Sequence, residues 1–277
     1  MHTHSSVSDG TETPAELMRA AKEAGIGTVA LTDHDSTAGW DAATAAARAE
    51  QITLIPGMEF STRVDYSSVH LLAYLFDPTD VGIVTEITRI RAARLTRAEQ
   101  MVQRIAFDYA ITWDDVLAQT TLDATVGRPH IADALVARGH ALTRSDAFAG
   151  ILHWKSGYYQ PHYAPDPLRA VELVRAAGGV PVIAHPATRG AADVIPEARL
   201  ARLAQAGLFG LELEHRENRP EATAHLAVLA EKYGLFITGS SDYHGTGKPN
   251  RLGENTTTPE VLERIIDQGR GSAPRYA

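Results

Sequence analysis

The sequence predicts an α/β protein in which βα units surround a parallel sheet or barrel, with a helical insertion. Two observations support this prediction. Short apolar runs alternate with longer amphipathic stretches over most of the 277 residues. The alternation stops between about residues 78 and 165, where the patterns are helical. The length suits one large domain that carries an insertion.

Each expected strand is a short apolar run bounded by turn residues. The runs are Gly27–Thr32, Ile52–Pro56, Val69–Leu75, Val180–Ala184, Phe209–Glu214 and Leu235–Gly239, with a seventh strand expected at His2–His4. The helices expected between them are Pro14–Ala24, Ala38–Glu50, Pro167–Ala177, Pro196–Ala206, Pro220–Tyr233 and Pro259–Gln268. Proline opens several of these helices, because its fixed φ angle suits a first helical turn.

Residues 79–165 are expected to form a helical subdomain, inserted between barrel segments 1–78 and 166–277. Its helices are expected at Val81–Phe107, Thr112–Ala118, Arg128–Arg138 and Ser145–Leu152, with Thr112 and Ser145 as N-caps. The first of these helices carries five arginines, Arg89, Arg91, Arg94, Arg97 and Arg104. They form either a solvated charged face or a basic wall that faces a phosphate-bearing substrate.

The composition excludes several classes of protein. A formal net charge of −8 argues against binding to duplex DNA, and bound divalent cations would offset part of that charge. The chain has no cysteine, so any metal must be held by nitrogen and oxygen ligands. No apolar run approaches the length of a membrane span, and no secretory signal opens the sequence. We therefore expect a cytoplasmic protein with no membrane partner.

Histidines and carboxylates gather at or near the ends of the expected strands. The clusters are His2-Thr3-His4 with Asp9, Asp33-His34-Asp35, Glu59, His70, His185, and Asp242 with His244. Residues two apart in a strand point to the same side, so both imidazoles of the first cluster can reach one metal. The carboxyl ends of strands in barrel-like folds converge on one site. Each cluster alone is weak evidence, but together they predict a metal site.

The number of candidate ligands exceeds the needs of a single ion. Histidine and carboxylate side chains suit zinc, manganese or iron. Two or three divalent ions that share a bridging carboxylate would use all of the clusters. The sequence therefore predicts a multinuclear metal site built from histidines and acids.

These segments resemble the PHP (polymerase and histidinol phosphatase) family. The resemblance lies in His2-Thr3-His4-Ser5, Ser8-Asp9-Gly10, Leu31-Thr32-Asp33-His34-Asp35, Pro56-Gly57-Met58-Glu59, Val69-His70, Gly178-Gly179 through Ala184-His185-Pro186, and Gly239-Ser240-Ser241-Asp242-Tyr243-His244-Gly245. The insertion segment Gly127-Arg128-Pro129-His130-Ile131-Ala132 is similar to the subgroup of nucleotide phosphatases and short-RNA exonucleases. The resemblance implies a distorted seven-stranded βα barrel, similar to a TIM barrel, with a trinuclear metal centre.

The resemblance also implies a ligand set for each metal. His2, His4, Glu59 and Asp242 would hold the first ion, Glu59, His70 and His185 the second, and Asp9, His34 and His244 the third. Manganese is expected first, with zinc, iron and magnesium as alternatives. Glu59, Asp33 and Asp242 are the candidate catalytic residues. Asp33 and Asp35 either orient ligands such as His34 or cap the following helix.

Four further residues are candidates for substrate contacts. Arg128 and His130 would bind phosphate from the insertion, and Arg189 and His215 are weaker candidates. The alternative for each is a surface or helix-terminal role. We expect a metal-dependent phosphoesterase acting on a small phosphorylated substrate, such as a nucleoside 3′,5′-bisphosphate or AMP, or removing nucleotides 5′→3′ from short RNA. The alternatives are a histidinol-phosphate-type phosphatase, a metal-binding module without turnover, and C–N bond hydrolysis. The oligomeric state stays open.

Overall fold

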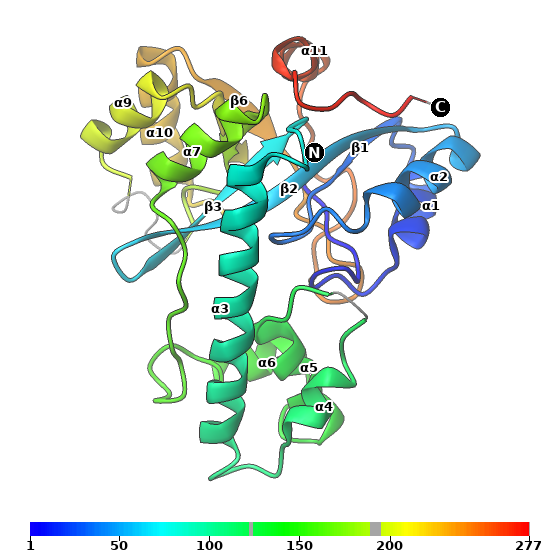
Figure 1. Ribbon diagram of the computed structural model, residues 1–277, viewed down its shortest axis with the longest axis vertical. Coiled ribbons are helices and arrows are strands. Elements are labelled where there is room, and N and C mark those ends of the chain that lie inside the picture. The colour runs from blue at the N-terminus through cyan, green and yellow to red at the C-terminus, as the bar shows by residue number, and fades with distance from the viewer. Residues whose placement is uncertain (122–123, 189–194, 277) are drawn as a thin grey trace.

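The computed structural model describes residues 1–121, 124–188 and 195–276 (Figure 1). Six strands form one curled sheet in chain order, β1 to β6. They are β1 (Thr28–Leu31), β2 (Thr53–Val64), β3 (Ser67–Tyr74), β4 (Val180–Ile183), β5 (Gly210–Glu214) and β6 (Phe236–Gly239). β3 runs antiparallel to both β2 and β4, and the other neighbours are parallel. The prediction of a parallel sheet is therefore wrong for β3, which runs antiparallel because β2 and β3 form a tight hairpin.

The N-terminal segment does not form the expected seventh strand. It makes one isolated bridge, between Thr3 and Tyr243. Thr32 N donates to Thr3 O at 2.9 Å, and His4 N donates to Tyr243 O at 2.8 Å. Since Thr32 follows β1 and Tyr243 follows β6, the segment lies between the two edges of the sheet. This short bridge brings His2 and His4 beside the ends of both edge strands.

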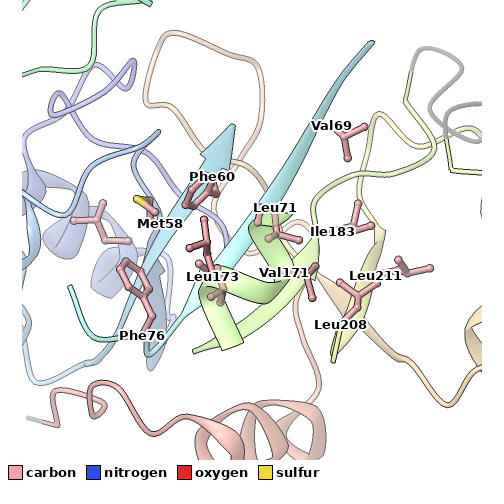
Figure 2. Packing of buried hydrophobic residues seen from close by; sticks show 14 of the residues in the cluster. Met58, Phe60, Val69, Leu71, Phe76, Val171, Leu173, Ile183, Leu208 and Leu211 are labelled. Carbon is pink, nitrogen blue, oxygen red and sulfur yellow. The ribbon is translucent and has the colours of Figure 1, made fainter. Parts of the chain in front are cut away.

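Helices cover the outer face of the sheet. They are α1 (Pro14–Glu23), α2 (Trp40–Glu50), α7 (Pro167–Ala176), α9 (Glu197–Gln205) and α10 (Pro220–Lys232). α11 (Pro259–Gln268) packs its apolar side chains in a second hydrophobic cluster. Figure 2 shows side chains of β2 to β5 and α7 gathered in the largest hydrophobic cluster. Alternate residues of β2 divide between the two faces. Phe60 enters this cluster, whereas Ile55 joins the second one on the opposite face, which is also the face of Glu59.

Four helices connect β3 to α7: α3 (Val81–Ile105), α4 (Trp113–Leu117), α5 (Arg128–Ala137) and α6 (Arg144–Ala149). α3 extends away from the sheet, and the shorter helices pack near its far end (Figure 1). These helices share a hydrophobic cluster of their own, which includes Met101, Ile131 and Leu135. None of the helices described here is long and apolar enough to cross a membrane.

The helix caps in this segment test two expectations. Thr112 caps α4 as expected, since its hydroxyl accepts from Asp115 N. The expected cap at Ser145 is wrong. Thr143 caps α6 instead, and its hydroxyl accepts from Asp146 N at 3.1 Å. A hydroxyl three residues before an acidic residue is the pattern that starts a helix, and it occurs here two residues earlier than expected.

Candidate metal centre

The sheet topology brings the predicted ligands to one end of the sheet. His34 follows β1, His185 follows β4, and Asp242 follows β6. Glu59 was expected after a strand, but it lies inside β2, because β2 continues to Val64 as one arm of the hairpin. His70 lies near the start of β3 and pairs with Ser61 in the β2–β3 register. Because β3 is antiparallel, its start lies beside the carboxyl ends of the parallel strands.

Glu59 is the centre of the site. Its carboxylate is buried, and imidazole nitrogens from five histidines surround it. The nearest pairs are Oε2 with His2 Nε2 (3.3 Å), His4 Nε2 (3.1 Å) and His34 Nδ1 (3.0 Å), and Oε1 with His70 Nδ1 (2.6 Å) and His185 Nε2 (3.3 Å). Each carboxylate oxygen therefore faces a different set of histidines, which is the geometry that a bridging ligand needs.

Two further buried acids extend the site. Asp242 Oδ1 lies 3.4 Å from His2 Nε2 and 3.3 Å from His4 Nε2. Asp9 Oδ1 lies 3.2 Å from His244 Nε2, and its Oδ2 lies 3.7 Å from His34 Nε2. The histidines are therefore shared between the three carboxylates, so the site is one continuous cluster.

The local backbone is fixed in unusual conformations at the site. His185 has a φ of 30° and Asp242 has a φ of 52°. A left-handed conformation at a residue other than glycine costs about 1–3 kcal/mol, and such residues gather at functional sites. Gly10 follows Asp9, and a Cβ at Gly10 would overlap the carbonyl group of His4. Only glycine therefore lets the loop that carries Asp9 pack this closely against His4.

Four overlapping groups of side chains could hold metal ions. They are His4, Asp9, His34 and His244; His2, Glu59 and His185; His2, His4 and Asp242; and His34, Glu59 and His70. Within each group one donor atom per residue lies within 4.8 Å of the others. Together the groups contain all nine residues that the sequence suggested as ligands. Their overlap at Glu59, His2, His4 and His34 suits several ions better than one.

The electrostatics of the site favour bound cations. Burial alone would raise the pKa of Glu59, but His34, His70 and His2 hold that pKa well below its usual value. Burial opposes protonation of His4, yet hydrogen bonds to Asp242 and Glu59 raise its pKa to about 9. In the metal-free cluster His4 thus holds a proton, which a divalent ion would displace, whereas burial lowers the pKa of His34 and of His244.

Unsatisfied donor atoms support the same interpretation. His34 Nδ1, His215 Nε2 and His244 Nε2 are buried, and although carboxylate oxygens lie 3.0 to 3.7 Å away, these atoms make no hydrogen bond to the described residues. Buried polar atoms in folded proteins nearly always have a partner. Histidine and carboxylate donors, with no sulfur, suit manganese, zinc or iron, so the residues present fit such ions.

The acids that flank His34 have other partners than expected. Asp33 accepts hydrogen bonds from Ser5 N at 2.8 Å and from Ser8 Oγ at 2.6 Å, and Ser8 Oγ lies 3.3 Å from His4 Nδ1. Asp35 accepts from the backbone and hydroxyl groups of Ser61. The expected contacts with His34 are absent from the described hydrogen bonds. Capping of the next helix is also wrong, because Gly39 occupies the N-cap of α2.

The candidate substrate residues that the structure describes have different surroundings. His215 is buried beside it, with Nε2 3.7 Å from Asp242 Oδ2. Arg128 opens α5 and lies 5.3 Å from the rings of both Phe148 and Tyr159. His130 is buried, and its Nδ1 accepts from Gly127 N at 3.1 Å, which caps α5. Arg189 lies outside the described residues.

The sequence interpretation missed two charged residues of the site. Glu212 is fully buried; its oxygens lie 3.1 and 3.2 Å from His2 Nδ1, and one accepts from His185 N at 3.0 Å. Lys248 Nζ lies 2.6 Å from Asp242 Oδ2. An acid inside the apolar run Leu211-Glu212-Leu213 was a signal for Glu212. Lys248 lies in a loop, where no spacing rule indicated it.

Comparison with known proteins places the chain in a family. The model of the PHP domain matches residues 1–116. A 3′,5′-nucleoside bisphosphate phosphatase from Chromobacterium violaceum is 29% identical, over 96% of this chain and 94% of the relative. The 5′-3′ exoribonuclease Rnm of Salmonella typhimurium is 30% identical, over 96% and 91%. The structure of a candidate metal-dependent phosphoesterase from Bifidobacterium adolescentis has a TM-score of 0.94 and 44% identity, and the match covers 97% of this chain and 95% of that one. The chain belongs to the PHP domain family.

Proposed function

We propose that this PHP-family phosphoesterase hydrolyses phosphate esters of nucleotides at a centre of two or three divalent metal ions. The observation that carries the proposal is Glu59, a buried carboxylate whose two oxygens face different histidines. Bound ions would supply an activated water at neutral pH and neutralise phosphoryl charge. Manganese is the first choice, and zinc, iron or magnesium are the alternatives.

We assign nine side chains to the ions. The proposed sets are His2, His4, Glu59 and Asp242; Glu59, His70 and His185; and Asp9, His34 and His244. The short distances around Asp242 and Asp9 support the first and third sets. His34 also lies 3.0 Å from Glu59, so it could serve the second set as well.

Residues behind the ligands would fix their orientation. Glu212 faces His2 Nδ1, which leaves His2 Nε2 directed toward Glu59 and Asp242. A carboxylate in this position sets the tautomer of a metal-binding histidine. Asp33 would act on His4 through Ser8, which is a different role from the one expected for it at His34. Lys248 would hold Asp242 in place through the ion pair between them.

The substrate would lie between this centre and the helical segment 79–165, which we propose to be the insertion that contributes to substrate binding. Arg128 and His215 are the proposed contacts, together with Arg189 and His130. His215 is buried against Asp242, which supports its role. The two curated relatives described above act on nucleoside bisphosphates and on RNA, which supports a nucleotide substrate.

Stepwise 5′→3′ removal of nucleotides from short RNA is the second candidate function. The relative named as an exoribonuclease supports it, since the match covers nearly the whole of both chains. Both activities need the same metal chemistry and differ in how the rest of the substrate is held.

A metal-supplemented hydrolysis screen tests the proposal. The substrates would be AMP, a nucleoside 3′,5′-bisphosphate, short RNA, histidinol phosphate and sugar phosphates, with released phosphate or mononucleotide as the readout. Metal analysis of protein purified without chelators should find two or three first-row ions per chain. Preference for histidinol phosphate would point to the alternative phosphatase. One ion or none in fully active protein would contradict the multinuclear centre.

A further inference from the structure

Arginines are buried where the helical segment meets the sheet. Arg94 and Arg97 share the buried face of α3 with Ile90 and Met101, and their exposed fractions are only 7% and 6%. Arg63 of β2 is half-buried nearby, and its charge acts on Arg97. Arginine is almost never buried to this extent unless an anion accompanies it.

The carboxylates present do not balance these charges. Arg94 Nε lies 2.8 Å from Asp35 Oδ2, and Arg94 Nη2 donates to Ser61 Oγ at 2.6 Å. Arg97 has no hydrogen-bond or ion-pair partner among the residues that the structure describes, and its Nε is buried. Arg63 donates to Tyr66 O at 3.2 Å and has a buried Nε without a hydrogen bond. Burial would raise the pKa of Tyr159, but a hydrogen bond from Arg63, followed by the nearby arginine charges, lowers it. For these three arginines, Asp35 is the carboxylate at ion-pair distance within the described ranges.

The pKa values of Arg97 and His162 are lowered by burial and by the nearby positive charges. Burial lowers the pKa of Arg97 well below its usual value, and the charge of Arg94 acts in the same direction. Burial, followed by the charges of Arg94 and Arg97, lowers the pKa of His162 to about 2. A buried cation without a counter-ion is costly, so an anion bound here would be strongly favoured.

The cluster of Arg63, Arg94 and Arg97 adjoins the metal centre. Ser61, which binds Arg94, lies opposite His70 in the β2–β3 register. Side chains opposite each other in an antiparallel pair are about 4.5–5.5 Å apart at Cβ. Asp35 directly follows His34 in the chain. The contacts of Arg94 with Asp35 and Ser61 therefore place its positive charge next to residues that neighbour two candidate ligands, His34 and His70.

We propose that Arg97, with Arg63 and Arg94, binds a second phosphoryl group of the substrate, one that is not hydrolysed while the first lies at the metal centre. The guanidinium group presents a planar set of donors that matches phosphate oxygens. The substrate class is therefore a nucleotide with two phosphoryl groups. The second group is either the other phosphate of a nucleoside bisphosphate or the next phosphodiester of a short RNA. This inference rests on the proposed function and specifies its substrate.

The test uses Arg97→Met, which removes the charge and keeps most of the volume. Hydrolysis is measured for AMP, a nucleoside 3′,5′-bisphosphate and a short oligoribonucleotide. We expect kcat/KM to fall by roughly 10- to 100-fold for substrates with a second phosphoryl group, the usual value of charge-assisted hydrogen bonds, and to stay within about twofold for AMP. Loss confined to the bisphosphate or to the oligonucleotide would support the subsite and identify its natural ligand. Arg104→Met is the matched control, because Arg104 is exposed on the same helix.

A second measurement separates this inference from the proposed function. Calorimetry with chelator present compares the binding of AMP and of adenosine to metal-free protein, because the phosphoryl group of AMP can occupy the arginine subsite without the ions. Wild type should bind AMP roughly tenfold or more tightly than adenosine, and Arg97→Met should remove that preference. If wild type hydrolyses none of the substrates but keeps this preference, the proposed function fails and the subsite stands.

The outcomes that overturn the subsite are also defined. Equal losses on AMP and the bisphosphate would place Arg97 at the reacting phosphate, and no loss on any substrate would make it structural. Thermal unfolding should show Arg97→Met to be as stable as wild type, because it removes an unpaired buried charge. If that variant does not fold, Arg97→Lys is used. Lysine keeps the charge and lacks the planar set of donors. Arg97→Gln removes the charge. If both variants fold and both bind the phosphorylated ligand with the same preference as wild type, the assignment of Arg97 is refuted.

Discussion

Replacing Glu59 with glutamine tests the centre of the proposed site. The substitution keeps the shape of the side chain and removes one negative charge that faces five imidazoles, at distances from 2.6 to 3.3 Å. Two of the four potential metal-binding groups include Glu59. A unit charge about 4 Å from another contributes about 4 kcal/mol at an effective dielectric constant of about 20. Turnover should therefore fall by about 10³-fold.

The assay is turnover of a nucleotide monophosphate, with metal content measured on the same preparation. Asp9→Asn is the matched control, since Asp9 belongs to one metal-binding group rather than two. The Glu59 variant should lose more metal and more turnover than the Asp9 variant. Circular dichroism establishes that both variants fold. A folded Glu59→Gln protein with ordinary turnover, or with less metal loss than Asp9→Asn, would refute the bridging position of Glu59.

Three further predictions follow from the site. Glu212→Gln should weaken metal affinity about 10- to 100-fold in a chelator competition assay, because the carboxylate facing His2 Nδ1 is lost, and unchanged affinity would argue against that role. Metal binding at pH 7 should release protons, because the pKa of His4 in the metal-free protein is about 9 and the ion must displace the proton of His4. Calorimetry in two buffers of different ionisation enthalpy measures the number of protons released. That number should fall above pH 9, where His4 is already deprotonated. Arg128→Ala should lower kcat/KM about 10- to 100-fold for substrates with a second phosphate, leaving metal content and a small chromogenic ester unaffected; equal losses on both substrates would place Arg128 at the reacting phosphate.

The sequence predicted the positions of most elements, and its errors in the sheet have one physical cause. The other apolar runs were located to within a few residues, because burial of a strand depends on its own composition, but β2 ends eight residues beyond the expected Pro56 and His2–His4 forms only an isolated bridge. The direction of β3 depends on the two-residue connection to β2, which a composition pattern does not reveal. β2 continues past Glu59 because its partner β3 lies alongside as far as Val64. The end of β2 was therefore set by pairing, which is a tertiary property.

The candidate ligands could be found because metal chemistry restricts them to a few residue types near strand ends. The residues that orient these ligands could not be predicted, because their role depends on which ligand the fold places next to them. Glu212 illustrates this difference. In the sequence it is an acid within an apolar strand, and only the fold brings it to His2, whose position is about two hundred residues earlier in the chain.

The sequence left two roles open for the five arginines of α3, a solvated charged face or a basic wall that faces the substrate. Their burial in the structure separates them into two groups. Arg89 and Arg104 are exposed, in agreement with a solvated charged face. Arg94 and Arg97 continue the buried stripe of Ile83, Ile90, Met101 and Ile105, with the spacing of three, four or seven residues that a helix face requires. Because a charge at such a position costs free energy without a partner, its presence there argues for a ligand rather than for solubility. The positions of Arg94 and Arg97 on the core-facing side of α3 are therefore the sequence signal that supports the proposed phosphate subsite.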